Sequence, residues 1–325
     1  MVIMQTSSRI KLASWLTATS IALLLIVLLM KGNLFHLTPA SEQAALTSLE
    51  SKTPIRFKVN ETGHVVDLSA TDSTMNDTLA IYLKELPALQ RLHLERSGIS
   101  DAALQHVTGL KNLEALFLDE TEVTDTGMLQ LEQSDQLRTL SLAQCKVGDA
   151  GLLPLSRLVE LKLLNLNQTD VTDAGLKHLE PLKKMESLYA SETELTGPGL
   201  QSLGELPQLT HLDLSGIQVD AALIESLRQF PNLELLYLGN STIDDQLIAS
   251  LMTALTEATP KLRALSLKET PLSDSAIPSL KSLQQLKHLA IVQLQGTRIT
   301  KPAFKELASA VTEVNFSVNY SERDD

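Results

Sequence analysis

The chain has 325 residues, of which 43% are hydrophobic and 3% aromatic, so aliphatic side chains must fill most of its core. Its formal net charge of −12 argues against nucleic acid as a partner, because phosphate binding needs a basic surface. A single cysteine, Cys145, excludes a disulfide within the chain and any zinc or redox motif built from cysteines.

The N-terminal region carries the pattern of a membrane anchor. Residues 12–30 contain no charge, and as a helix they would span about 28 Å, close to the hydrocarbon thickness of a bilayer. Residues 1–11 carry basic but no acidic side chains, which favours a cytoplasmic N-terminus. We therefore expect a transmembrane signal anchor at 12–30. A cleaved signal peptide is the alternative, although Pro39-Ala40-Ser41 is a poor cleavage site and the apolar run is long.

Two short segments precede the main part of the chain. Residues 31–52 are expected to link the anchor to the folded domain, with a short helix over Ser41–Lys52. Residues 53–64 contain apolar side chains that alternate with basic ones over 55–59, which indicates a half-buried strand followed by a turn. We expect residues 53–64 to form an N-terminal cap that shields the first unit of the following array from water.

A repeated unit covers residues 65–310 and determines the predicted fold. In its clearest copy, residues 161–184, L-x-x-L-x-L alternates as a strand does, and leucines three residues apart then mark one face of a helix. Seven successive intervals between copies are 24 residues long, and the last two are 29 and 27. The ten copies start at Val65, Leu89, Leu113, Leu137, Leu161, Met185, Leu209, Leu233, Leu262 and Leu289. Each copy therefore predicts a strand, a turn and a helix.

Small polar residues recur at fixed places in the unit. The twelfth position holds Ser, Thr or Asp in most copies and the thirteenth often holds Asp, which predicts a helix N-cap and a charge that complements the helix dipole. Ser or Thr at the ninth position would bond loop backbone groups, and Cys145, at the same place, is expected to be a small buried residue. Glycines at 127, 151, 175 and 199 mark close packing between adjacent helices. The copy from Leu233 has extra residues that should lengthen its helix, and residues 311–325 read as a C-terminal cap and tail.

The pattern L-x-x-L-x-L-x-x-T-x-V-T-D-x-G-L at 161–176 resembles the leucine-rich-repeat family. It looks like the cysteine-containing class with threonine in place of cysteine, and it is similar to Thr-containing 24-residue repeats of bacterial, planctomycete-type envelope proteins. The resemblance implies an α/β solenoid with a curved parallel sheet on the concave side and helices on the convex side. It also implies a scaffold for recognition rather than one particular activity.

In such a solenoid, the residues that flank the strand leucines would face the concave surface. Tyr189 and Tyr237 are two of only four tyrosines, and both fall in the same column of the stacked strands. Aromatic anchors among small polar residues are typical of protein-binding surfaces, whereas the alternative is a solvated sheet face with scattered aromatics. The predicted partner-binding residues are Phe117, Leu163, Asn165, Asn167, Tyr189, His211, Asp213, Leu235 and Tyr237.

The same surface offers little for catalysis or metal binding. His211 and Asp213 share one strand face, and Ser187 or Ser215 could complete a triad, but the sequence shows neither a nucleophile turn nor an oxyanion loop. His93 lies five units from His211, about 24 Å away at one strand spacing per unit, so these histidines cannot share a metal. We therefore expect no enzymatic activity, cofactor, metal or small-molecule substrate.

These observations predict a single-pass membrane protein of a bacterial envelope. Its N-terminus would be cytoplasmic, and its repeat domain would be periplasmic or extracellular and would bind a protein partner through the concave face. The alternative is a structural or self-associating envelope spacer without a selective ligand, since a stack of ten units is about 48 Å long before curvature.

Overall fold

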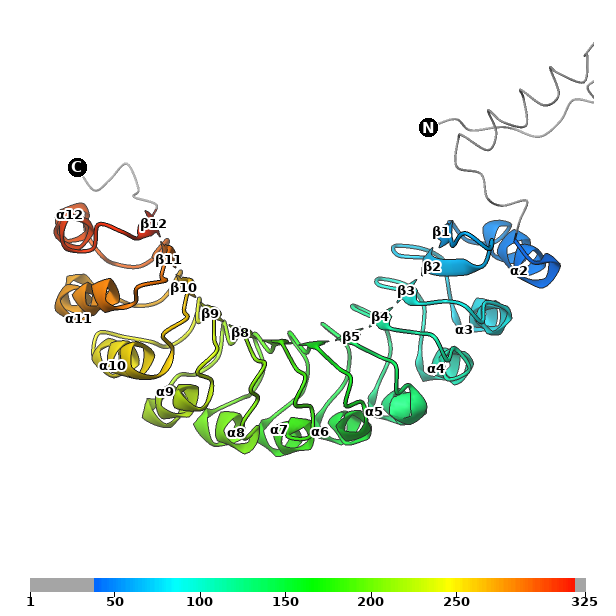
Figure 1. The fold of residues 1–325 in the computed structure, drawn as a ribbon, viewed down its shortest axis with the longest axis horizontal. Helices are drawn as coiled ribbons and strands as arrows, with labels where there is room; N and C mark the ends of the chain where they lie inside the picture. The colour runs from blue at the N-terminus through cyan, green and yellow to red at the C-terminus, as the bar shows by residue number, and fades with distance from the viewer. Residues whose placement is uncertain (1–37, 319–325) are drawn as a thin grey trace, which may run out of the picture.

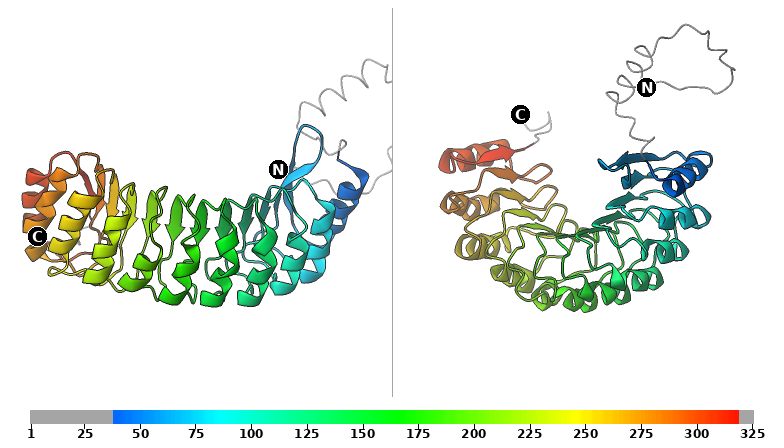
Figure 2. Two further views of the ribbon diagram at one scale, coloured as in Figure 1. Left: turned by 60° about the horizontal axis from the view of Figure 1, so that its bottom comes forward. Right: turned by 45° about the vertical axis from the view of Figure 1, so that its right-hand side comes forward.

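The structure, a computed structural model, describes residues 38–318 as a curved solenoid (Figure 1). One sheet of twelve strands lines the concave side, and helices line the convex side, as predicted (Figure 2). The strands follow one another in chain order from β1 to β12. Strands β1 and β2 pair antiparallel, whereas every later neighbouring pair is parallel.

Each repeat contributes one short strand and one helical segment within residues 38–318. The strands are β1 (Arg56–Val59), β2 (Val65–Ser69), β3 (Arg91–His93), β4 (Ala115–Phe117), β5 (Thr139–Ser141), β6 (Leu163–Asn165), β7 (Ser187–Tyr189), β8 (His211–Asp213), β9 (Leu235–Tyr237), β10 (Ala264–Ser266), β11 (Ile291–Gln293) and β12 (Asn315–Ser317). The α-helices are α2 (Ala40–Glu50), α3 (Asp77–Ala80), α4 (Asp101–Val107), α5 (Asp125–Met128), α6 (Asp149–Leu152), α7 (Asp173–Leu176), α8 (Gly197–Ser202), α9 (Ala221–Ser226), α10 (Ile248–Ala258), α11 (Ile277–Leu280) and α12 (Lys301–Ala310). Short 3₁₀-helices are η2 (Ile81–Glu85), η3 (Leu129–Gln133), η4 (Pro154–Arg157), η5 (Lys177–Leu179), η6 (Leu227–Gln229), η7 (Asp274–Ala276) and η8 (Lys281–Gln285).

The parallel strands stack so that equivalent repeat positions lie side by side. Leu164 on β6 stands opposite Leu188 on β7, and both side chains are fully buried. The longer copy keeps this register, because Leu236 on β9 stands opposite Leu265 on β10. Its extra residues lie in α10, the expected longer helix on the convex side. Burial of the strand leucines in one continuous column therefore holds the stack together.

A left-handed residue ends the strand segment of every repeat. Eight of these residues are not glycine, and their φ angles lie between 51° and 59°; Gln168, at 55°, is typical. The backbone N–H of Gln168 donates a hydrogen bond to the carbonyl of Ser191 in the next repeat, 2.8 Å away. The sequence did not indicate this conformation, because Glu, Gln and Arg adopt positive φ at a steric cost. The bond to the next repeat opposes that cost.

A ladder of aspartates at the thirteenth position joins neighbouring repeats. Asp149 accepts hydrogen bonds from the backbone N–H of Thr172 at 2.8 Å and from its hydroxyl at 2.7 Å. Thr172 in turn accepts a bond from the N–H of Ala174, which confirms its predicted N-cap role. The matching two-bond pairs are Asp77–Ser100, Asp101–Thr124, Asp173–Thr196, Asp245–Ser273 and Asp274–Thr300. The aspartates thus bind the next repeat, besides lying at a helix N-terminus.

The ladder explains the glycine that recurs in the repeats, and it is interrupted at two junctions, where Gly197 and Ala221 stand at the thirteenth position. A Cβ added to Gly175 would lie 2.5 Å from the carboxylate oxygen Oδ1 of Asp149, so glycine makes room for the ladder. In the sixth repeat Gly197 replaces the aspartate, and a Cβ there would lie 2.5 Å from the carbonyl carbon of Ala222. Helices α8 and α9 therefore pack backbone to backbone. The hydroxyl of Ser226 adds a hydrogen bond to the carbonyl of Gly197 at 3.0 Å.

The N-terminal cap begins with α2, earlier than the expected start at residue 53. Leu46 and Leu49 of this helix are fully buried against the first repeat. Glu42 is 1% exposed; its carboxylate lies 2.6 Å from Nδ1 of His64 and accepts a bond from the N–H of Val65 at 2.8 Å. The second part of segment 31–52 is therefore packed on the domain and does not act as a free linker.

The expected N-terminus at 1–11 and transmembrane anchor at 12–30 lie outside the described residues. Over residues 38–318, none of the helices is both long and apolar enough to cross a bilayer. At the other end, β12 forms the last strand of the sheet, and residues 319–325 of the predicted tail also lie outside the described part.

We predict that Asp149→Ala destabilises the domain by about 1–3 kcal/mol, because it removes two hydrogen bonds to the half-buried Thr172. The matched control is Asp170→Ala, which removes an exposed carboxylate and should change the free energy of unfolding by less than about 0.5 kcal/mol. Urea denaturation followed by circular dichroism measures both values. Equal effects of the two substitutions would show that the ladder adds nothing to stability.

Candidate binding surface on the concave face

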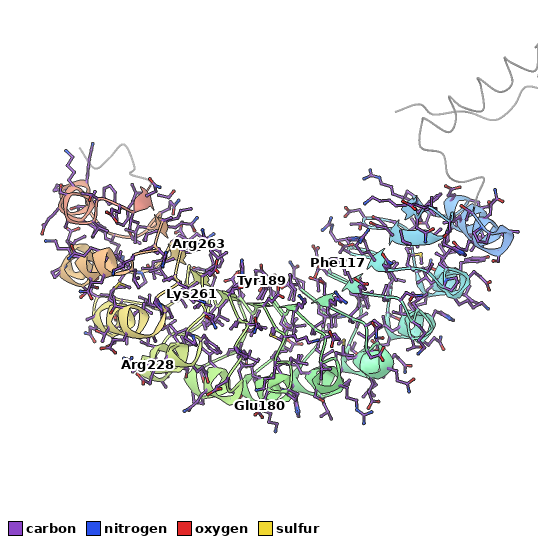
Figure 3. All side chains as sticks on the ribbon, in the orientation of Figure 1. Phe117, Glu180, Tyr189, Arg228, Lys261 and Arg263 are labelled. Carbon is purple, nitrogen blue, oxygen red and sulfur yellow. The ribbon has the colours of Figure 1, made fainter. Side chains whose placement is uncertain are left out.

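Eight of the nine predicted binding residues lie on the adjacent strands β6 to β9 or directly after them. Asn165, Tyr189, Asp213 and Tyr237 form one in-register column along these strands. A parallel column contains Leu163, Ser187, His211 and Leu235. All nine predicted residues are half-buried. Figure 3 shows Phe117 and Tyr189 on the concave side, opposite Glu180 and Arg228 on the convex side.

The side-chain amides of Asn165 and Asn167 already form hydrogen bonds within the solenoid. Asn165 donates a hydrogen bond from Nδ2 to Oγ of Ser141 at 3.0 Å, and its Oδ1 accepts one from the N–H of Asn167 at 3.1 Å. Asn167 Oδ1 accepts a bond from the N–H of Ser191 in the next repeat at 2.8 Å. Their amide groups therefore order the loops that follow the strands, a role that the sequence pattern did not reveal.

Phe117 lies apart from the other predicted residues, because β5 separates its strand β4 from β6. It stacks on the imidazole of His93, with ring centroids 4.4 Å apart and planes 6° from parallel. His93 Nδ1 in turn lies 3.4 Å from the carboxylate of Glu95, which also accepts a bond from the hydroxyl of Thr71 at 2.7 Å. Phe117 thus belongs to a second, N-terminal patch on the concave face.

The charge of Asp67 in this N-terminal patch is neutralised within the chain. Asp67 accepts hydrogen bonds from Nζ of Lys58 at 3.0 Å and from Nε of Arg91 at 3.1 Å. Burial acts to raise the pKa of Asp67, but these two cations outweigh it and hold the pKa below its ordinary value of 3.8. Burial raises the pKa of Asp119, and the nearby carboxylates of Glu95 and Glu120 add to this effect.

The carboxylate of Asp213, on the central strands, has no cationic partner of this kind among residues 38–318. Asp213 lies between Tyr189 and Tyr237 in the register of the sheet, and its Oδ1 accepts a hydrogen bond from the N–H of Ser215 at 2.9 Å. No cation among residues 38–318 forms an ion pair with this carboxylate. Burial raises the pKa of Tyr237, and the neighbouring Tyr189 and Asp213 raise it further. These three side chains form what we call the tyrosine–aspartate triplet.

His211 and Cys145 both form hydrogen bonds with other groups of the chain. His211 Nδ1 lies 2.7 Å from Oγ1 of the preceding residue, Thr210, so this nitrogen is not directed at Asp213. Cys145 is 3% exposed, its Sγ donates to the carbonyl of Leu118 at 3.0 Å, and burial raises the pKa of its thiol. The thiol is therefore a buried structural group. The part of the chain that the structure describes holds no cluster of three or more metal-ligating side chains.

Sequence reasoning missed one apolar pair on the convex side. Leu129 and Leu153 occupy the seventeenth position of consecutive repeats and are 55% and 54% exposed. The sequence could have indicated this pair, because the same repeat position holds a polar residue in other repeats: Gln105, Lys177 and Gln201. Substitutions of this pair can therefore serve as a convex-side control for substitutions on the concave face.

A family model and one solved structure agree with this architecture. A family model described as "Leucine Rich repeat" matches residues 136–156. A leucine-rich-repeat protein of Leptospira interrogans has a similar structure, with a TM-score of 0.53 and 22% identity over 73% of this chain and 56% of that one. An internalin of Listeria monocytogenes gives a TM-score of 0.45 and 16% identity over 90% of this chain and 98% of that one. No curated protein matches the chain.

The ten stacked repeats and the shared fold give this chain a leucine-rich-repeat architecture, as its sequence pattern predicted, and the family model matches one of these repeats. It spans little more than half the length of the Leptospira protein. Proteins of this family generally bind other proteins and typically serve as scaffolds without catalytic activity.

We predict that Asp67→Asn lowers stability by up to about 1 kcal/mol at pH 7, because it removes the charge that pairs with Lys58 and Arg91. The folded-state pKa of Asp67 lies below the unfolded value, so its contribution is present above pH 3.8 and is lost as the pH falls through the folded pKa. Urea unfolding at pH 7 and pH 2.5 tests this difference. A constant effect of the substitution at both pH values would contradict the proposed ion pairs.

Proposed function

We propose that this chain is a membrane-anchored, extracytoplasmic protein that recognises a protein partner through the concave surface of strands β6 to β9. The observation that carries the proposal is the contiguous set formed by Tyr189, Asp213 and Tyr237 with His211 and Leu235 on neighbouring strands. Large aromatic and aliphatic side chains fixed on a rigid sheet lose little entropy on binding, which is typical of the residues that dominate protein interfaces.

The central strands suit a partner better than the N-terminal patch does. At the N-terminal end, acidic groups such as Asp67 and Glu95 already have basic or hydroxyl partners within the chain. A partner there would have to replace existing bonds. On the central strands, the hydroxyls of Tyr189 and Tyr237 and the charge of Asp213 have no side-chain partner among residues 38–318, so they remain available for new contacts.

The membrane part of the proposal rests on the uncharged residues 12–30 and the basic residues that precede them. We expect externally added protease to cleave the repeat domain in intact cells, or in cells whose outer membrane has been permeabilised. A cytoplasmic protein serves as the control for lysis. Full protection of the repeat domain under conditions that leave this control intact would contradict the proposed orientation.

The binding surface is tested by capture of partners from cells that produce the tagged full-length chain. We predict that Tyr189→Asp together with Tyr237→Asp lowers capture at least about tenfold, because two aromatic anchors are replaced by charges. The matched control, Leu129→Asp together with Leu153→Asp, places the same two charges on the convex side and should retain capture.

Thermal unfolding of both double variants verifies that they remain folded. Loss of capture in the convex variant alone would move the binding surface to the helices. Equal capture by all three forms would contradict recognition through either surface.

A further inference from the structure

We propose that the tyrosine–aspartate triplet binds an arginine side chain of the protein partner. This inference rests on the proposed function, since it assigns a chemical class to the group that the concave surface recognises. It is carried by three observations: the order of the three side chains along the sheet, the charge of Asp213, which forms no ion pair among residues 38–318, and the apolar side chain of Leu235, which precedes Tyr237 by two residues on β9.

The register fixes the order of the three side chains. Tyr189 stands opposite Asp213, and Asp213 stands opposite Tyr237, each one strand further along. Neighbouring strands are about 4.8 Å apart, so the two tyrosine backbones are separated by roughly 10 Å. A planar group that contacts a ring on each side, at about 3.5 Å from each, needs about 7 Å between the rings. The triplet can therefore place one flat cation between two aromatic side chains and above a carboxylate.

The charge of Asp213 is only partly compensated. Its carboxylate is half-buried and accepts one hydrogen bond, from the backbone N–H of Ser215. Lys268, which follows β10 two strands away, lies against Gly239 instead and forms no ion pair with Asp213. Desolvation of a carboxylate without a countercharge is unfavourable, so a cation from a partner would be bound more strongly here than at a neutralised site. The net charge of −12 also favours the approach of a basic partner.

Arginine fits these features better than lysine. Its guanidinium is planar, keeps its charge, stacks on aromatic rings and donates two parallel hydrogen bonds to a carboxylate. Leu235, half-buried on β9 next to His211 on β8, offers apolar surface for the aliphatic stem of the same side chain. The ammonium of lysine would satisfy the charge of Asp213 but would not fill the planar space between the tyrosines.

The test titrates the purified full-length chain with acetyl-Gly-Arg-Gly-amide, while NMR follows ring signals of isotopically labelled tyrosine. We expect two tyrosines to shift with an affinity in the millimolar range. Asp213→Asn should weaken this affinity at least about tenfold, because it removes the charge and keeps the shape. Asp170→Asn, an exposed acidic residue on a loop, is the matched control and should bind as the unmodified chain does.

Two further peptides identify the cation. Replacement of arginine by citrulline removes the charge from the same shape and should abolish the shifts. Replacement by lysine should weaken binding several-fold. Absence of shifts with the arginine peptide, equal binding of citrulline, or unchanged binding by Asp213→Asn would each overturn the proposal, and equal binding of lysine would overturn the choice of arginine.

Capture from cells separates this inference from the proposed function. If Asp213→Asn retains a partner that the tyrosine double variant loses, the concave surface binds a protein without the arginine contact. If neither variant alters capture, recognition through this surface is itself contradicted. Loss of capture in both variants, together with binding of the arginine peptide, supports both proposals.

Discussion

The in-register pairing of parallel strands is the constraint on which the rest of this structure depends. Each strand of the repeat array lies about 4.8 Å from the next, and equivalent positions of successive repeats stand side by side. One apolar residue per strand then forms a continuous buried column, and the residues on either side of it form two surface columns. The chemistry of the concave face is therefore set by a few repeat positions, and unusual residues at those positions, such as Tyr189 and Tyr237, become neighbours.

Much of this arrangement could be predicted from the sequence. A period of 24 residues with L-x-x-L-x-L gives the strand, the buried column and the surface columns directly, so the contiguity of β6 to β9 followed from counting. The lengthening of α10 could also be predicted, because extra residues in a repeat can be accommodated on the convex side without a change in strand register.

The remaining features depend on contacts that a single repeat does not reveal. The positive φ of Gln168 is stabilised by a bond to the next repeat, and the two bonds of Asp149 also cross the junction. Sequence periodicity shows that a residue recurs, but it does not show which repeat it contacts. For the same reason the sequence pattern predicted only a surface position for Asn167, although its amide oxygen orders the loop of the following repeat.

The aspartate ladder also bears on how the number of repeats can change. Removal of residues 125–148 would leave Asp101 bonded to Thr124 and Asp149 bonded to Thr172, so a shortened array would keep its existing pairs. Removal of residues 197–220 would instead bring Leu223 to the place of Gly199, where the carboxylate of Asp173 lies. Gain or loss of whole repeats by recombination is therefore compatible with the aspartate pairs in the N-terminal half of the solenoid. At the α8–α9 junction beneath the tyrosines, loss of a repeat would place a leucine against the carboxylate of Asp173.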